Sequence, residues 1–269
     1  MNMLKKFFCL VFLGFFLICL LQIRTYKPEI LKYSDHEEVV SSGKLSPEGK
    51  QQAFREKRNV DIVVDPGHGG IDGGTTGGGV QEKRWALRLG HELAKELRAR
   101  GLDVMMTREE DKALSLDRRC QVANASDAKA FVSIHFNYSH KPSVSGFETY
   151  YSWPKSLATM GAIRRSLGVS EGVTFRDQRG ELLARKIQKA VVADMKVRDR
   201  GARNSQFWVT RNTKAPSVLL ECGFLSNQAE REDYENSAYR LRVVTAISNA
   251  LEAYLEEYKE AELKGIELK

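Results

Sequence analysis

The chain has 269 residues, 42% of them hydrophobic, so it can bury a substantial core and is not disordered throughout. Its formal net charge of +7 favours an anionic neighbourhood such as nucleic acid, lipid headgroups or envelope polymers. Basic residues mostly stand beside acidic ones, as in Arg108-Glu109-Glu110, whereas a nucleic-acid-binding surface is expected to carry a basic stripe. We therefore expect no nucleic acid partner, and an ordinary solvated basic surface explains the charge.

Residues 1–24 predict an export signal or a membrane anchor. Lys5 and Lys6 precede an apolar run from Phe7 to Leu21, which has the length of a signal-peptide core and is short for a membrane-spanning helix. Because no Ala-x-Ala-like cleavage site follows, we favour an uncleaved anchor in the inner membrane over a cleaved signal peptide. Both place the protein in the cell envelope, on the periplasmic or extracytoplasmic side.

Residues 25–58 have a different composition from the rest of the chain. Pro28, Pro47 and scattered charges interrupt any apolar period, which is typical of a tether. Ser46 is a suitable N-cap for a short helix over 47–57. We expect the folded domain to begin after this segment.

From residue 59 onward, short apolar runs alternate with longer amphipathic stretches. Strands are predicted at 61–65, 104–107, 130–135, 147–151, 207–209 and 217–221, and helices at 85–100, 116–125, 182–195 and 239–258. Strands that alternate with helices indicate a mostly parallel sheet covered on both faces. We predict a single α/β domain over 59–258, with a twisted, mostly parallel six-stranded sheet and helices on both faces, followed by a charged tail over 259–269.

Four ionisable side chains are expected to meet at one edge of this sheet. His68 lies shortly after the first predicted strand, His135 ends the third and Glu221 ends the sixth. The carboxyl ends of parallel strands share an edge, and open α/β folds bind ligands there. Glu82 lies in the predicted loop that enters the first long helix, where the positive end of the helix dipole favours a carboxylate. That loop leaves the same edge, so Glu82 can approach His68.

Two imidazoles and one carboxylate are a suitable ligand set for catalytic zinc, because they leave a fourth position for water. Zinc lowers the pKa of that water toward 7 and polarises the carbonyl under attack. A general base must then accept the proton and return it to the leaving nitrogen. These residue types therefore favour His68, Glu82 and His135 as zinc ligands and Glu221 as the catalytic base.

Each of these side chains has an alternative interpretation. Either histidine could be an ordinary loop residue, Glu82 could be only a charge at a helix N-terminus, and Glu221 could pair with Arg118 or Arg211. The spacing of the four residues is not a compact metal-binding signature, so it is weak evidence by itself. Convergence at one sheet edge strengthens the joint prediction.

The other histidines and the cysteines are weaker candidates. His36 lies in the tether, His91 lies inside a predicted helix, and His140 follows the third strand into a turn. Cys120 and Cys222 form no Cys-x-x-Cys motif and no disulfide framework. We expect both to be buried, inert thiols.

Four blocks of the sequence resemble the zinc-dependent N-acetylmuramoyl-L-alanine amidases of the Amidase_3 type. They cover about residues 59–256 and stand in the order that the family has. The blocks are Val64-Asp65-Pro66-Gly67-His68-Gly69-Gly70-Ile71-Asp72-Gly73-Gly74 with Glu82-Lys83; Thr107-Arg108 with Asp111, Arg118 and Ala123-Asn124; Ser133-Ile134-His135-Phe136-Asn137 with Gly146-Phe147-Glu148-Thr149-Tyr150-Tyr151; and Val218-Leu219-Leu220-Glu221-Cys222-Gly223-Phe224-Leu225-Ser226-Asn227.

The resemblance implies zinc held by His68, Glu82 and His135, with Glu221 as the catalytic carboxylate. It implies a peptidoglycan substrate, cut at the amide bond between N-acetylmuramic acid and the first L-alanine of the stem peptide. Such enzymes remodel the wall or separate daughter cells, and a division-machinery activator is a candidate partner. The implied fold is the α/β domain that the residues themselves predict.

The sequence departs from the family pattern in two places. Cys222 stands where another small or aliphatic residue is usual, and we expect its thiol to point inward. Residues 152–180 are longer than in minimal family members, and some relatives carry there a helix that covers the zinc. Pro154 to Leu167 can form a short helix, although Gly161 and Gly168 weaken it. Our hypothesis is that 152–180 partly gates the cleft.

Two rival functions differ from the amidase in substrate or in class. The first is a zinc peptidase or amidase that acts on another envelope peptide or on a lipid-linked precursor, which an anchor would bring within reach. The second is a non-catalytic envelope-binding module. Retention of all three ligands and of Glu221 argues against the module, because it would not need an unpaired carboxylate beside a metal.

Overall fold

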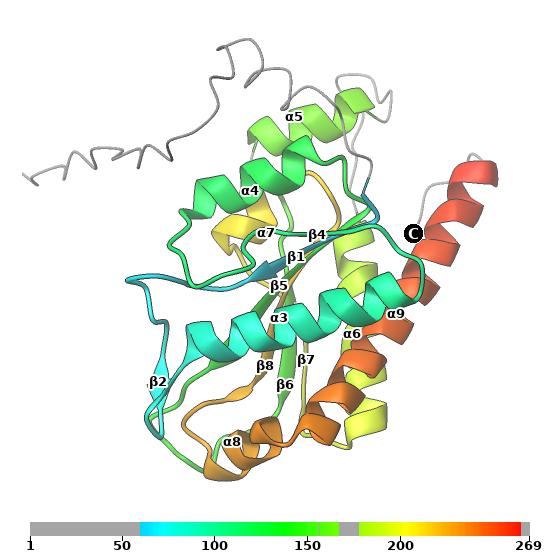
Figure 1. The fold of residues 1–269 in the computed structure, drawn as a ribbon. Coiled ribbons are helices and arrows are strands. Elements are labelled where there is room, and N and C mark those ends of the chain that lie inside the picture. Colours follow the sequence, from blue (N-terminus) through cyan, green and yellow to red (C-terminus); the bar gives the residue numbers. More distant parts are fainter. Residues whose placement is uncertain (1–59, 156, 167–177, 265–269) are drawn as a thin grey trace, which may run out of the picture. The chain divides into compact units, whose positions relative to one another are not determined.

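A six-stranded sheet forms the centre of the computed structural model, which describes residues 60–155, 157–166 and 178–264 (Figure 1). The order of the strands across the sheet is β4-β1-β5-β8-β6-β7. The strands are β1 (Ile62–Pro66), β4 (Val104–Met106), β5 (Ala130–Asn137), β6 (Phe147–Tyr151), β7 (Asp199–Asn204) and β8 (Ser217–Phe224).

Most of the neighbouring strands in the sheet are parallel. β1 pairs in parallel with β4 and β5, and β5 pairs in parallel with β8. β6 is antiparallel to β8, and β7 runs parallel to β6, so this pair runs against the other four. The predicted mostly parallel sheet is confirmed. The carboxyl ends of β1, β5 and β8 therefore lie at one edge, as the candidate site requires.

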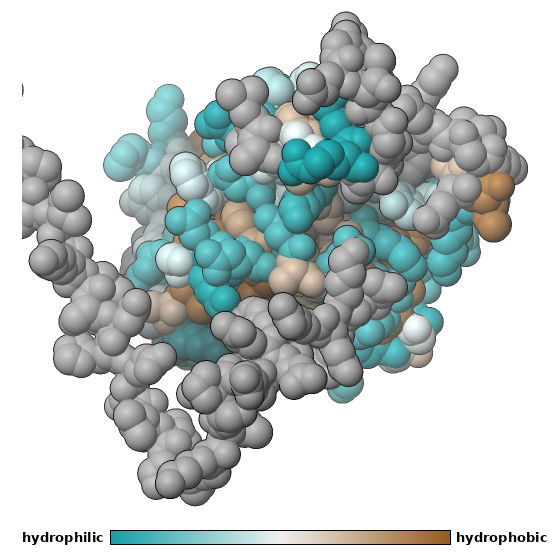
Figure 2. All heavy atoms as spheres, turned by 90° about the horizontal axis from the view of Figure 1, so that it is seen from above, coloured by the Kyte–Doolittle hydropathy of each residue, from teal (hydrophilic) through white to brown (hydrophobic). Residues whose placement is uncertain are grey.

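Helices cover both faces of the sheet, as predicted (Figure 1). One face packs against α3 (Glu82–Ala99), α6 (Arg179–Met195) and α9 (Ser237–Lys264), which bury the larger apolar core. The other face carries α4 (Leu116–Ala125) and α7 (Trp208–Asn212), which bury a smaller core that includes Phe131 of β5. Figure 2 views the side of α4 and α5 (Leu157–Ser166), where hydrophilic residues alternate with small hydrophobic areas.

The predicted strand at 207–209 is wrong, because this segment begins the helix α7. In chain order, the fifth strand of the six-stranded sheet is instead β7, whose sequence Asp-Arg-Gly-Ala-Arg-Asn shows no apolar alternation. β7 lies at an edge of the sheet, where only one neighbour covers it, and backbone pairing with β6 holds it as a strand. Tertiary pairing therefore overrides the local pattern here.

Several other elements differ from the prediction in extent. α3 begins at Glu82 itself, three residues before the predicted start, and α9 continues to Lys264, inside the predicted tail. The sequence reading also missed α8 (Gln228–Glu235) and the hairpin of β2 (Thr76–Gly77) and β3 (Val80–Gln81). These elements are short, so they bury too little apolar surface to show a clear period.

Some predicted segments lie outside the described residues. They are the signal or anchor over 1–24, the tether over 25–58, and much of the segment 152–180. Within 152–180, the structure describes 152–155, the helix α5 and 178–180. In the part of the chain that is described, none of the helices is both long enough and apolar enough to span a bilayer.

Candidate metal centre

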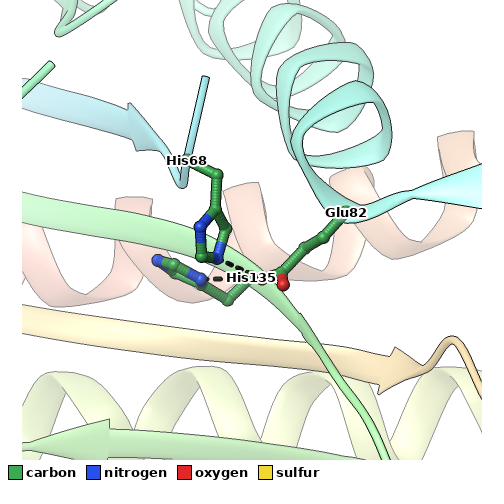
Figure 3. Close-up of side chains that lie close together, drawn as sticks. All are labelled: His68, Glu82 and His135. Atoms are coloured by element: carbon green, nitrogen blue, oxygen red, sulfur yellow. Dashed lines mark hydrogen bonds and ion pairs between the residues drawn. The ribbon is translucent and has the colours of Figure 1, made fainter. Parts of the chain in front are cut away.

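His68 is positioned by the sharp turn that follows β1. The residue adopts a left-handed backbone conformation with φ of 58°, which is uncommon for a residue other than glycine. Its Nδ1 donates to Asp72 Oδ2 over 2.8 Å, and its Nε2 lies 3.1 Å from Glu82 Oε1 (Figure 3). The bond to Asp72 fixes the ring orientation and, in the neutral ring, leaves the lone pair on the nitrogen that faces Glu82.

His135 comes from β5 and meets the same carboxylate. Its Nδ1 lies 2.8 Å from Glu82 Oε1, and its ring packs edge-to-face on that of His68 with centroids 4.9 Å apart. Gly67 leaves the space that this ring occupies, since a Cβ added there would lie 2.4 Å from His135 Cε1. β5 continues to Asn137, so His135 lies within the strand. This corrects the prediction that His135 ends the strand.

Glu82 is the first residue of α3 and does not lie in a loop, which corrects the sequence prediction. Its side chain is buried, and Oε1 accepts the Phe136 backbone N–H while Oε2 accepts the Thr75 N–H. Burial raises the pKa of Glu82, but hydrogen bonds from His135 and His68 outweigh it and lower the pKa to about 2. The carboxylate is therefore ionised and held in place at neutral pH.

The three predicted ligands converge on one point (Figure 3). One ligand atom from each of His68, Glu82 and His135 lies within 4.8 Å of the others. Gly74 lies directly against this group, and its lack of a side chain leaves room for the ligands. A Cβ at this position would lie only 2.6 Å from both Glu82 Oε2 and His68 Cδ2. Two imidazole nitrogens and one carboxylate oxygen fit zinc and leave room for a fourth ligand.

Glu221 lies beside His135 through the register of the sheet. It pairs with His135 on β5 and with Glu148 on β6, so the three residues form a row across β5, β8 and β6. Its Oε2 is buried and has no hydrogen-bond partner among the described residues, so it is not bonded to Arg118 or Arg211. β8 continues past Glu221 to Phe224, which corrects the predicted strand end.

The environment of Glu221 favours the protonated side chain in the metal-free protein. Burial, together with the negative charges of Glu82 and Glu148, raises the pKa of Glu221 well above its usual range. Glu148 is itself buried, accepts a hydrogen bond from Asn137 Nδ2 at 2.7 Å, and lies 3.4 Å from Arg200 Nε. A carboxyl group with a raised pKa can hold a proton near neutral pH.

A buried ionic network supports the turn that carries His68. Asp65 on β1 accepts hydrogen bonds from Thr107 and Ser133 and forms an ion pair of 2.7 Å with Arg119. Arg119 also donates to the carbonyl oxygen of His68 at 2.6 Å. This network was not predicted from the sequence, because only the fold brings Asp65 and Arg119 together.

A cavity of about 660 Å³ opens beside the metal ligands. Its lining includes His68, Glu82, His135 and Glu221. It also includes four exposed apolar or aromatic side chains that the sequence reading did not select: Leu116, Tyr138, Phe207 and Trp208. The sequence predicted a strand at 207–209 and gave Phe207 and Trp208 no place in the site.

Among the described residues, the weaker candidates take no part in this cluster. His91 Nε2 contacts the Glu109 carbonyl oxygen at 2.8 Å, and the His140 ring packs on Tyr138. Cys120 and Cys222 are free, buried thiols, as predicted. His36 lies outside the described residues.

Comparison with known proteins identifies the family. Residues 62–253 match the family described as N-acetylmuramoyl-L-alanine amidase. The chain belongs to this family. Among its relatives, the N-acetylmuramoyl-L-alanine amidase LytC of Bacillus subtilis strain 168 is 30% identical over 193 residues, which are 72% of this chain and 35% of LytC. The enzyme class predicted from the sequence is thereby confirmed.

Solved structures of family members share the fold. The crystal structure of N-acetylmuramoyl-L-alanine amidase from Clostridium difficile 630 has a TM-score of 0.61 and 32% sequence identity, covering 74% of this chain and 98% of that chain. The CwlD amidase from Clostridioides difficile, in complex with the GerS lipoprotein, has a TM-score of 0.62 and 27% identity, covering 74% of this chain and 99% of that chain. The described domain therefore has the same α/β fold as these amidases.

Proposed function

We propose that this family member is a zinc-dependent peptidoglycan amidase that cuts the bond between N-acetylmuramic acid and the L-alanine of the stem peptide. One observation carries the proposal: His68, Glu82 and His135 converge at a cavity that also contains the buried carboxyl group of Glu221. Bound zinc would supply an acidic water and a Lewis acid for the amide carbonyl. The family match supports the choice of bond.

The chain's own residues orient the reactants and move the proton. Asp72 orients the His68 ring, and the backbone N–H groups of Thr75 and Phe136 hold the Glu82 carboxylate, so these groups are organised before substrate arrives. The positive charge of bound zinc would favour the ionised form of Glu221. Its Oε2, which has no hydrogen-bond partner among the described residues, would then accept the proton of the attacking water. It then returns that proton to the leaving nitrogen of L-alanine, which prevents the amide from re-forming.

We further propose that the enzyme acts in the cell envelope, either in wall remodelling or in daughter-cell separation. The basic and apolar pattern of residues 1–24 supports export, with an uncleaved anchor in the inner membrane. A partner that activates the enzyme is also part of the proposal. The structure of the relative CwlD in complex with the GerS lipoprotein supports this part of the proposal.

Gating by residues 152–180 stays a prediction. The described helix in this segment, α5, packs against α7, whose first residue, Trp208, lines the cavity. Movement of α5 could therefore change the shape of the cavity through α7. Deletion of 154–178 from a protein that still folds should change the rate of wall hydrolysis, and an unchanged rate would remove the gating role.

The decisive experiment incubates the detergent-solubilised, zinc-loaded chain with peptidoglycan fragments and identifies the products by mass spectrometry. Intact stem peptides with a free L-alanine amine should appear, and they should disappear with a chelator or with Glu221→Gln. Glu110→Gln is the matched control, because its side chain is 74% exposed and lies outside the cavity lining.

Two outcomes would overturn parts of the proposal. If zinc binds stoichiometrically but stem peptides stay attached, the substrate is wrong, and lipid-linked precursors and other envelope peptides are the next substrates to assay. If no zinc binds, the ligand assignment is wrong and a non-catalytic envelope-binding module becomes the better explanation.

A further inference from the structure

An apolar wall lines the side of the cavity formed by α4 and α7. We define it by Leu116, Phe207 and Trp208, which are 53%, 36% and 48% exposed. Large apolar side chains with this much exposure are costly to solvate, and here they gather in one cavity beside the catalytic residues. The proposed chemistry, which needs zinc and Glu221, uses none of the three.

The aromatic side chains of the wall are held in place by residues of other elements. Trp208 Nε1 donates to Asp117 Oδ1 at 2.9 Å, which ties the first residue of α7 to the first turn of α4. The rings of Phe207 and Tyr150 pack in a T-shaped arrangement, with centroids 5.0 Å apart. These contacts hold Phe207 and Trp208 in place while both residues stay partly exposed, so the wall is preorganised for a ligand with an apolar face.

The described side chains around the cavity offer an acidic peptide no free cation on this wall. Asp117 lies at the edge of the indole, so the nearest charge to Trp208 that a side-chain contact reveals is negative. The one arginine in the lining is Arg119, and its guanidinium already binds Asp65 and backbone carbonyl oxygens. A stem peptide, which carries carboxylates, would find no available side-chain cation among these lining residues.

We infer that the apolar wall binds a sugar ring of the glycan, so that the muramoyl side of the scissile amide lies over Phe207 and Trp208 and the stem peptide leaves in another direction. A pyranose ring has C–H groups on its flat faces and hydroxyl groups around its rim, which suits an exposed indole face with polar neighbours. This inference rests on the proposed function for its substrate, because it names the part of peptidoglycan that the cavity recognises.

The first test compares two substrates that share the scissile amide and differ in the sugar. One is an N-acetylmuramoyl tripeptide, and the other is the corresponding D-lactoyl tripeptide, which lacks the ring. Trp208→Ala should lower kcat/KM about tenfold for the first, mainly through KM, and leave the second unchanged. Trp208→Tyr should restore most of the loss. The matched control is Leu241→Ala on α9, whose side chain is 58% exposed and lies outside this cavity.

The second test needs no catalysis. Peptide-free oligomers of the glycan are titrated into the full-length, zinc-loaded protein while tryptophan fluorescence is recorded. A saturable change that disappears in Trp208→Phe is expected, with circular dichroism showing that the variant is folded. Absence of this change overturns the inference, as does an equal loss of kcat/KM on both substrates in the first test. If the wild type cuts neither substrate but binds glycan through Trp208, the proposed function fails and the sugar site stands.

Discussion

Replacing Gly67 with alanine should remove the metal site and leave the fold intact. The added Cβ would lie 2.4 Å from His135 Cε1 and 2.7 Å from Nδ1, whereas ordinary contacts begin at 3.4 Å. The imidazole must therefore shift by about 1 Å, and zinc–ligand distances tolerate only about 0.2 Å. Because Gly67 does not have a positive φ, alanine fits the backbone, and the cost to stability is that of overpacking, about 1–3 kcal/mol.

The loss of zinc affinity should exceed the 10- to 100-fold that is typical when only a supporting residue around a metal is changed. Competition with a chromophoric chelator measures it, and urea denaturation of the chelated protein measures stability separately. Gly161→Ala on α5 is the control, since its Cβ would meet only Arg165 Nη1 at 3.5 Å. Wild-type zinc affinity in a folded Gly67→Ala protein would refute the assignment of His135 as a ligand.

Two further predictions concern protonation. Burial lowers the pKa of His68, but Glu82 and Asp72 outweigh it and raise the pKa above 6.5. Protonated His68 should therefore stabilise the metal-free protein fully below pH 6.5, and this stabilisation should be lost as pH rises through the folded-state pKa. Urea denaturation with chelator at several pH values checks it, and Asp72→Asn should reduce the pH dependence; an equal dependence in the variant would contradict the assignment. Burial also raises the pKa of Cys120 to about 11, so iodoacetamide at pH 8 should label it only after unfolding, as peptide mass spectrometry would show.

The sequence predicted that His68, Glu82 and His135 converge because their positions depend on features that leave a local signal. His68 and His135 follow clear apolar strand runs, and the parallel order of those strands brings them to one edge. Glu82 was placed near the correct helix terminus, although it belongs to the helix. These inferences needed only strand direction and the position of a helix start.

The cavity wall could not be predicted in the same way. Phe207-Trp208-Val209 is a short apolar run that is compatible with a strand, and only its packing against α4 makes it the start of α7. β7 carries a polar sequence whose strand conformation depends on β6. Local patterns carry no information about such neighbours, so the exposed side chains of the cavity wall were not predicted.

The row of His135, Glu221 and Glu148 is fixed by the sheet, independently of the loops around the cavity. Backbone hydrogen bonds between β5, β8 and β6 set the spacing of this row, and a slip of one residue would turn Glu221 to the opposite face of the sheet. The loops around the cavity contribute nothing to that spacing. Insertions and deletions in them can therefore change the entrance to the cavity while the spacing of the row stays constant.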